Sequence, residues 1–297
     1  MNINIRDLHV QFCQEALIIR NFRPATIRGY KHTLDSFLKY SKIDLLEEVT
    51  TEKLRSFLYQ GRLEKHWTAD TFIFHYKNFR SFFKWCVGRQ YMKENPILSI
   101  EKAKLETKLP KRITKHEAQY LLDYAFNRHY TYRHERYRNW ALIAVMIYGG
   151  LRAGEVLNLK LNEVDIKNCV ISVNLGKGGK DRVVPICYPL QKILSEYVRD
   201  RERLERQCIY FFTSLRGDKP FTYSGLKKVI ETLKQGSGVK FSAHRLRHTF
   251  ATLMLEGGCD LFSLQKMMGH SDIKTTTVYL STTVNHLQEQ IRKHPLG

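Results

Sequence analysis

Four stretches of the chain carry residue types that can bind or transfer a phosphoryl group. The first, residues 149–157, places Arg152 directly after two glycines at the opening of a predicted helix, with Glu155 three residues later. That spacing puts both side chains on one helical face, so Arg152 could be no more than a structural partner of Glu155. The other interpretation is that its guanidinium binds an anion. Taken alone, the spacing favours neither.

The second stretch, residues 176–182, is rich in glycine and carries Lys177 and Lys180. It contains no G-x-x-x-x-G-K-[ST] pattern, so it is not a phosphate-binding loop of that kind, and a lysine at the tip of a turn is usually just solvated. The apolar residues on its two sides change to a period typical of strands, which predicts a β-hairpin. These flanking residues are Val170, Ile171, Val173, Val183, Val184 and Ile186.

The third and fourth stretches add histidines and a tyrosine. His244 and Arg247 lie one helical turn apart, and the pair could hold one phosphate, with the guanidinium binding two oxygens. Residues 264–279 predict a helix, a turn at Gly269-His270, and a second helix carrying Tyr279. A histidine after a glycine is often a helix cap, and one tyrosine among sixteen more often packs than reacts.

Together these stretches form a phosphoryl-transfer set that has no acidic cage for a metal ion. The set resembles the tyrosine recombinase (integrase) family, particularly its compact bacterial Xer-like and phage-integrase members. The matching elements occur in family order and extend the resemblance over nearly the whole chain. They are G-L-R-x-x-E at 150–155, G-K-G at 176–178, H-x-x-R-H-T at 244–249, and residues 264–279 with G-H and T-T-x-x-Y.

The resemblance implies that the Tyr279 phenol attacks a DNA backbone phosphate and forms a 3′-phosphotyrosyl link with release of a 5′-hydroxyl. It assigns assisting roles to Arg152, Lys177, His244, Arg247 and His270. Glu155 is expected to support its neighbours, because a carboxylate facing the phosphate would repel it. Lys180 is an alternative to Lys177 as the acid that protonates the leaving oxygen. No cofactor is expected.

The first third of the sequence predicts a bundle of helices. Apolar residues recur with helical spacing over 8–18, after Pro24, over 51–63 with Thr51 as N-cap, and from Thr68 to just before Asn95-Pro96. We expect a helical, DNA-binding domain over 1–96. Residues 97–113 hold basic residues between prolines and predict a linker, either an ordinary surface loop or a strap along DNA.

The remainder, 114–297, is expected to be the catalytic domain. It opens with Thr114 and Glu117 in the spacing of a capping box. Residues 140–148 predict a buried helix, because the stretch is too short to cross a membrane, which takes about 20 residues. The fold class expected is mainly α with a small antiparallel β-sheet (α+β), in the two-domain architecture of tyrosine recombinases.

Composition bounds the partners. The chain of 297 residues has 49 Lys+Arg against 29 Asp+Glu, a formal net charge of +20, which attracts polyanions. Nucleic acid is the first partner to consider, although an anionic membrane surface or ribosomal RNA fits the same charge. The six cysteines form no C-x-x-C pair, which favours reduced thiols over zinc or disulfides. No secretory signal is present, so we expect a cytoplasmic, nucleoid-associated protein.

The resemblance further implies a clamp on a double-stranded DNA recombination site and a tetrameric synaptic complex, with a partner recombinase or a DNA-bending accessory protein as further possibilities. The tail at 281–297 would pack either on a neighbouring protomer or on its own chain. Two other functions stay open. A type IB topoisomerase would use the same catalytic set, and a DNA-binding regulator would keep the fold without catalysis. The sequence names neither the DNA site nor the biological role.

Overall fold

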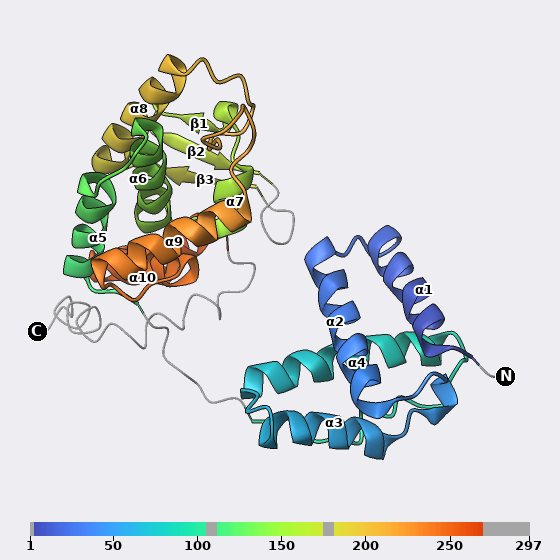
Figure 1. Cartoon of the computed structure of the whole chain (residues 1–297). Coiled ribbons are helices and arrows are strands. Elements are labelled where there is room, and N and C mark those ends of the chain that lie inside the picture. Colours follow the sequence, from blue (N-terminus) through green and yellow to red (C-terminus); the bar gives the residue numbers. More distant parts are fainter. Residues whose placement is uncertain (1–2, 105–111, 175–180, 270–297) are drawn as a thin grey trace, which may run out of the picture. The chain divides into compact units, whose positions relative to one another are not determined.

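The computed structural model describes residues 3–104, 112–174 and 181–269. The chain divides into two compact units, Met1–Lys108 and Leu109–Gly297 (Figure 1). The described residues are mainly helical, with one small antiparallel sheet in the second unit. The predicted fold class, α+β with two domains, is therefore confirmed. No helix of these residues is long and apolar enough to cross a membrane.

The described part of the first unit is a helical bundle, as the sequence predicts. Pro24 occupies the first turn of its helix, where the missing N–H costs nothing. The predicted N-cap Thr51 is wrong by one residue, because Thr50 Oγ1 accepts the hydrogen bond from Lys53 N while Thr51 Oγ1 donates to the carbonyl of Pro96. The elements are α1 (Ile5–Ile18), α2 (Pro24–Ser41), the 3-10 helix η1 (Leu46–Glu48), α3 (Thr51–Leu63) and α4 (Ala69–Gly88).

Aromatic rings fill the core of the first unit. The Phe57 ring lies edge-on to Phe37 and Phe79, with centroids 5.5 and 5.9 Å away. It also contacts Trp67, whose indole stacks on the His75 imidazole at 4.4 Å. Such pairs add directional attraction to the area they bury. They join α2, α3 and α4 into one packed body.

Residues just after α4 belong to that core. Ile97 and Ile100 are buried in the first unit's apolar cluster, whereas Ile113 is buried in that of the second. The basic segment predicted as a linker, 97–113, thus begins with residues that pack, and its middle, 105–111, lies outside the described residues. The boundaries assigned from the sequence stay a prediction.

The second unit is built around one buried helix. Thr114 and Glu117 form the predicted capping box, with Glu117 N donating to Thr114 Oγ1 and Thr114 N donating to Glu117 Oε2. The elements are α5 (Lys115–Asn127), α6 (Arg133–Tyr148), α7 (Ala153–Asn158), the 3-10 helix η2 (Leu161–Glu163), β1 (Val164–Asp165), β2 (Val170–Val173), β3 (Arg182–Pro185), α8 (Tyr188–Arg203), α9 (Tyr223–Ser237), α10 (Ala243–Glu256) and α11 (Leu261–Met268).

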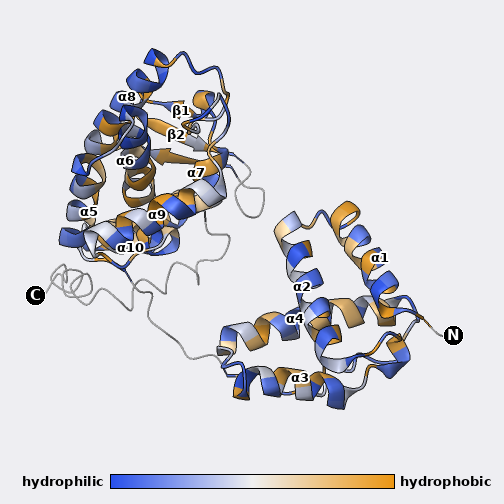
Figure 2. Ribbon diagram, in the orientation of Figure 1, coloured by the Kyte–Doolittle hydropathy of each residue, from blue (hydrophilic) through white to orange (hydrophobic). Residues whose placement is uncertain are grey.

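Helix α6 is the centre of this unit. Its residues 141–147 are all buried, as predicted for the stretch 140–148, and α5, α8 and α10 pack around it. Figure 2 shows hydrophilic residues in the first turns of α6 and hydrophobic residues in its later turns and on the strands. A helical segment that is apolar on every side, as residues 141–147 are, is a core element of a domain. The elements around α6 are held by this shared apolar surface.

The predicted hairpin is present as β2 and β3, which pair antiparallel with Ile171 opposite Val184 and Val173 opposite Arg182. Ile171, Val173 and Val184 are buried. The short strand β1, which the sequence did not predict, pairs with β2 at the other edge. The register places Arg182 at the end of the hairpin next to its turn.

Candidate active site

Arg152 sits where the chain leaves α6 and enters α7. Gly150 has φ +61°, a conformation that suits glycine, and Arg152 is the N-cap of α7. Its main-chain N donates to Glu155 Oε2 at 2.7 Å, and its Nη1 donates to Glu155 Oε1 at 2.8 Å. The structural pairing with Glu155 is therefore real. This pairing engages only one of the guanidinium groups in the site, because Arg247 also approaches the Glu155 carboxylate.

Arg247 comes from the first half of α10 and is buried. Its Nη1 donates to the carbonyl of Gly150 at 2.6 Å, and its Nη2 donates to the carbonyl of Met268 at 2.5 Å. Nη1 also lies 3.9 Å from Glu155 Oε2. The structure thus brings Arg247 together with Arg152 and Glu155, which come from a separate stretch of the sequence.

His244, one turn before Arg247, is exposed at the start of α10. The protein atoms around it, and then the positive charges of Arg247 and Arg152, lower the pKa of its imidazole. His248 lies one turn further, with its ring centroid 4.1 Å from that of His244. Burial, followed by the charges of His244 and Arg247, lowers the pKa of His248 to about 4. At neutral pH both rings are uncharged and can accept as well as donate a hydrogen bond.

The Glu155 carboxylate is the electrostatic centre of the cluster. Burial alone would raise its pKa, but hydrogen bonds from Arg182 and from Arg152 overcome this and hold the pKa at about 2. The group is therefore ionised throughout the neutral range. A permanently charged carboxylate that accepts this many hydrogen bonds orients its partners and does not act as an acid.

Arg182 is a site residue that sequence reasoning missed. Its Nη1 and Nη2 donate to the two Glu155 oxygens at 3.0 and 2.8 Å, and its Nε donates to the carbonyl of Met267 at 2.7 Å. Arg182 is the last residue of the glycine-rich stretch 176–182, in which only the lysines were predicted to act in the site. The sequence did contain a signal for Arg182. A basic residue at the start of a predicted strand, next to a predicted site, is a candidate for that site.

The three guanidinium groups differ in access to solvent. The Arg152 side chain is 28% exposed, against 6% for Arg182 and 3% for Arg247. An anion approaching from solvent would therefore meet Arg152 first. Arg182 and Arg247 lie behind it, bound to the carboxylate and to main-chain carbonyls.

Three predicted site residues, Lys177, His270 and Tyr279, lie outside the described residues, as does the alternative Lys180. Helix α11 ends at Met268, and its C-cap Gly269, which has φ +62°, directly precedes His270. The described part of the site therefore comprises Arg152, Glu155, His244 and Arg247 from the predicted set.

A second polar cluster in this unit is structural. His134 Nδ1 lies 3.0 Å from Asp200 Oδ2, and its Nε2 lies 3.3 Å from Thr213 Oγ1. The order hydroxyl, imidazole, carboxylate is that of a hydrolase triad. All three residues are buried, however, and no surface of the Thr213 side chain is open to a substrate. The cluster holds α6, α8 and the segment before α9 together.

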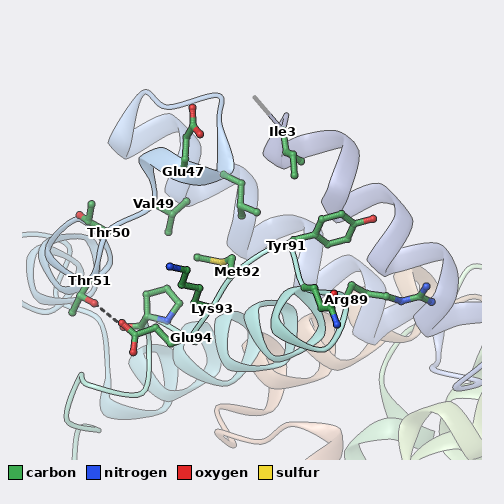
Figure 3. Close-up of a pocket in the computed structure, with 13 residues that line it drawn as sticks. Ile3, Glu47, Val49, Thr50, Thr51, Arg89, Tyr91, Met92, Lys93 and Glu94 are labelled. Atoms are coloured by element: carbon green, nitrogen blue, oxygen red, sulfur yellow. Dashed lines mark hydrogen bonds between the residues drawn. The ribbon is translucent and has the colours of Figure 1, made fainter. Parts of the chain in front are cut away.

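The first unit has a hollow of its own, of about 770 Å³, between the start of α3 and the segment that follows α4 (Figure 3). Arg89, Lys93, Glu47 and Glu94 line it together with apolar residues. Both signs of charge are present in similar number. The lining thus lacks the single-signed charge expected of a site for a polyanion.

Comparisons with known proteins agree on the family. Residues 111–286 match the family model described as "Phage integrase family", and residues 10–93 match that described as "Phage integrase, N-terminal SAM-like domain". The chain is 31% identical over 294 residues to tyrosine recombinase XerC of Bacillus pumilus, covering 95% of this chain and 94% of that protein. It is 29% identical to tyrosine recombinase XerD of Rickettsia bellii, covering 97% and 98%.

Solved structures give the same picture. The crystal structure of XerA recombinase aligns with a TM-score of 0.55 at 26% identity, covering 97% of this chain and 98% of that one. The post-cleavage complex of XerH recombinase with palindromic difH substrate aligns with a TM-score of 0.72 at 22% identity, covering 95% and 83%, and shares the fold. By its sequence over nearly its whole length and by its fold, the chain belongs to the phage integrase family of tyrosine recombinases.

Proposed function

We propose that this chain is a site-specific DNA recombinase that cuts and rejoins DNA through Tyr279. The phenol oxygen attacks a backbone phosphorus, the bond from phosphorus to the 5′-oxygen breaks, and a 3′-phosphotyrosyl link forms with a free 5′-hydroxyl. The energy of the broken bond stays in the new ester, so the 5′-hydroxyl of another strand can reverse the step without ATP. Integration, excision, inversion and dimer resolution all use this exchange.

The observation that carries the proposal is the cluster of Arg152, Arg247 and Glu155 at the end of α11, the helix that leads to His270. In the transition state, negative charge grows on the non-bridging phosphate oxygens. Guanidinium groups fixed in advance stabilise that charge without a cost of reorganisation, and one such donor is typically worth about 3–4 kcal/mol. Arg152 and Arg247 would act in this way.

The other predicted residues would move protons. Lys177, or Lys180 in its place, would protonate the leaving 5′-oxygen. His244 and His270 would hydrogen-bond the phosphate or take the proton from the phenol. The lowered pKa of His244 suits this role, because an uncharged imidazole can accept a proton at neutral pH. Glu155 would hold the arginines.

The proposed partner is a double-stranded recombination site, bound by a helical domain at 1–96 and a catalytic domain at 114–297 with the basic segment 97–113 joining them. The net charge of +20 supports this partner. We further propose a tetrameric synaptic complex, with 281–297 packing on a neighbouring protomer or on its own chain, and action in the cytoplasm at the nucleoid. A partner recombinase or an accessory DNA-bending protein would join this complex.

The test is covalent trapping. Purified wild-type protein and Tyr279→Phe are incubated, in buffer with EDTA, with nicked fragments of the source genome, then denatured and scored for protein-linked DNA. The phenylalanine variant lacks only the hydroxyl and serves as the matched control. Adducts from the wild type alone support the proposal, and sequencing the trapped fragments names the site.

Two other outcomes would change the assignment. If both proteins bind DNA and neither forms an adduct, the chain is a DNA-binding regulator or cleaves DNA only together with a partner recombinase. If the wild type forms adducts and relaxes supercoiled DNA but never joins strands from two duplexes, it is a type IB topoisomerase. Joining between two labelled duplexes that carry the trapped site separates a recombinase from both.

A further inference from the structure

Three successive carbonyls at the end of α11 each accept a hydrogen bond from a different arginine. The carbonyl of Met267 accepts from Arg182 at 2.7 Å and that of Met268 accepts from Arg247 at 2.5 Å. The third, that of Gly269, accepts a longer bond of 3.5 Å from Arg152 Nη2. The last carbonyls of a helix have no partner within it, so these bonds complete and fix the helix end.

The same three arginines surround one carboxylate. Glu155 and Arg182 are both nearly buried, with 8% and 6% of their side chains exposed, and Arg182 binds both carboxylate oxygens. The Arg152 side chain binds one of them, and its main-chain N donates to the other. Among these four side chains, three guanidinium groups face one carboxylate, which leaves two formal positive charges for an incoming phosphate.

Without Arg182, the Glu155 carboxylate would have to pair with other arginines. The nearest remaining partners of Glu155 would be Arg152 at 2.8 Å and Arg247 at 3.9 Å, and a buried carboxylate strongly favours such pairs. Glu155 would then compete with a phosphate for the guanidinium groups proposed to bind it. The end of α11 would at the same time lose its hydrogen bond at Met267.

Arg182 also contacts the residue before His270 directly. A Cβ built on Gly269 would lie 2.8 Å from Arg182 Cδ, so the aliphatic part of this arginine packs against the glycine main chain. Gly269 has φ +62°. The chain therefore turns out of α11 over the Arg182 side chain.

We propose that Arg182 is a positioning residue. It pairs with the Glu155 carboxylate and fixes the end of α11, so that Arg152 and Arg247 stay available to the DNA phosphate. This inference rests on the proposed function, since it concerns the same site. Arg182 is not expected to touch the phosphate, because all three of its guanidinium nitrogens donate to Glu155 or to the carbonyl of Met267.

The test compares Arg182→Met, Arg182→Lys, Glu155→Gln and the double variant Arg182→Met/Glu155→Gln. Each is assayed for single-turnover adduct formation on a duplex with the trapped site, nicked close to the scissile phosphate so that the released strand diffuses away. DNA affinity is measured by fluorescence anisotropy and folding by thermal unfolding. Methionine keeps the apolar stem that packs on Gly269 and removes the charge, whereas lysine keeps the charge.

For Arg182→Met we expect adduct formation to slow by about 10²-fold with DNA affinity almost unchanged, because a small misplacement of a binding group costs about that much. Adding Glu155→Gln should recover about tenfold of this loss, since the neutral amide no longer competes for the arginines. The rate of adduct formation by Arg182→Lys should lie between those of the wild type and Arg182→Met.

A structural role alone predicts a different pattern, in which the double variant is no faster than Arg182→Met. That result, or a wild-type rate for Arg182→Met, overturns the proposal. If Arg182→Met does not fold, the comparison rests on Arg182→Lys with and without Glu155→Gln, and absence of rescue there overturns it equally.

If wild-type protein forms no adduct on any fragment, the proposed function has failed rather than the positioning argument. The pairing is then tested by a double-mutant cycle of thermal unfolding between Arg182 and Glu155. Additive effects of the two substitutions on the free energy of unfolding would overturn the pairing of Arg182 with Glu155, and strong coupling between them would support it.

Discussion

The Phe250 ring lies directly against the main chain of Gly150. A Cβ built on Gly150 would be 2.2 Å from the Cδ1 atom of Phe250, and the φ of +61° at this glycine is one that other residues rarely adopt. The carbonyl of Gly150 accepts from Arg247 Nη1. Helix α10 thus meets the start of α7 through a ring on one side and a guanidinium on the other.

Gly150→Ala should therefore lower both stability and adduct formation. We expect the free energy of unfolding to fall by about 2–4 kcal/mol, from overpacking against Phe250 and from backbone strain. Thermal unfolding and single-turnover trapping measure the two effects. The matched control is Gly154→Ala in α7, where a Cβ would contact nothing within 4 Å. Equal effects of the two alanines would contradict the packing argument.

Arg152 and Arg247 should differ when each is replaced by alanine. Arg152 is the more exposed, and its loss leaves Glu155 paired with Arg182. Arg152→Ala should therefore slow adduct formation by about 10²–10³-fold with little change in melting temperature. Arg247→Ala should slow it and also lower the free energy of unfolding by about 2 kcal/mol or more, because two buried carbonyls lose their donor.

The measurement for this pair is thermal unfolding beside single-turnover trapping for each variant. A large loss of stability in Arg152→Ala, or none in Arg247→Ala, would show that the burial of the two side chains does not set their roles.

Two helical glycines of the first unit should respond to alanine with opposite sign. A Cβ on Gly61 in α3 would lie 2.2 Å from the Trp67 ring, whereas one on Gly88 at the end of α4 meets nothing within 4 Å. Alanine ordinarily favours a helix over glycine by about 1 kcal/mol. Gly88→Ala should thus be neutral or stabilising, and Gly61→Ala destabilising by about 1–3 kcal/mol. Urea unfolding followed by tryptophan fluorescence measures both; destabilisation by Gly88→Ala would refute the argument.

Stability of the first unit should fall as the pH is lowered from 7 to 5. Burial is the main cause that lowers the pKa of His9 and of His75 from 6.5 to about 4. Below pH 6.5 the unfolded chain binds protons at these rings that the folded chain does not, so acid favours unfolding. Each such histidine contributes a slope of up to about 1.4 kcal/mol per pH unit within this window, above the range where carboxyl groups titrate.

Urea unfolding at pH 7, 6 and 5 checks this slope. His9→Leu keeps an apolar side chain in the core and should reduce the slope. Phe82→Leu, a substitution in the ring that contacts His9, is the control, because it disturbs the same packing without removing a titrating group. If the free energy of unfolding of His9→Leu depends on pH as steeply as that of Phe82→Leu, the buried imidazole is not the cause of the slope.

Local patterns predicted much of the fold. The helix at 51–63, the capping box at Thr114 and the pairing of β2 with β3 follow from periodicity and from single residues with strong preferences. The N-cap at Thr51 was wrong because two adjacent threonines offer the same hydroxyl, and only the contact of Thr51 with Pro96 separates them. Strand β1 is too short to leave a period in the sequence.

Of the predicted site residues that the structure describes, the sequence predicts the local pairs and not the long-range connections. Spacing placed Arg152 beside Glu155 and His244 beside Arg247, since each pair lies on one helical turn. It could not show that Arg182, 27 residues from Glu155, binds the same carboxylate. Nor could it show that Arg247 donates to the carbonyl of Gly150, which is 97 residues away. Such contacts depend on tertiary packing that no local pattern records.

Helix α11 is held by a small apolar cluster of its own. Phe250, Ala251 and Leu255 of α10 pack with Leu264 and Met268 of α11, apart from the main core around α6. Segments with few buried apolar contacts open locally at a lower free energy than the domain unfolds. Amide hydrogens of α11 should therefore exchange with solvent well before those of α6. Each opening would release the three arginine-bound carbonyls together, so the site can be dismantled and rebuilt while the rest of the domain stays folded.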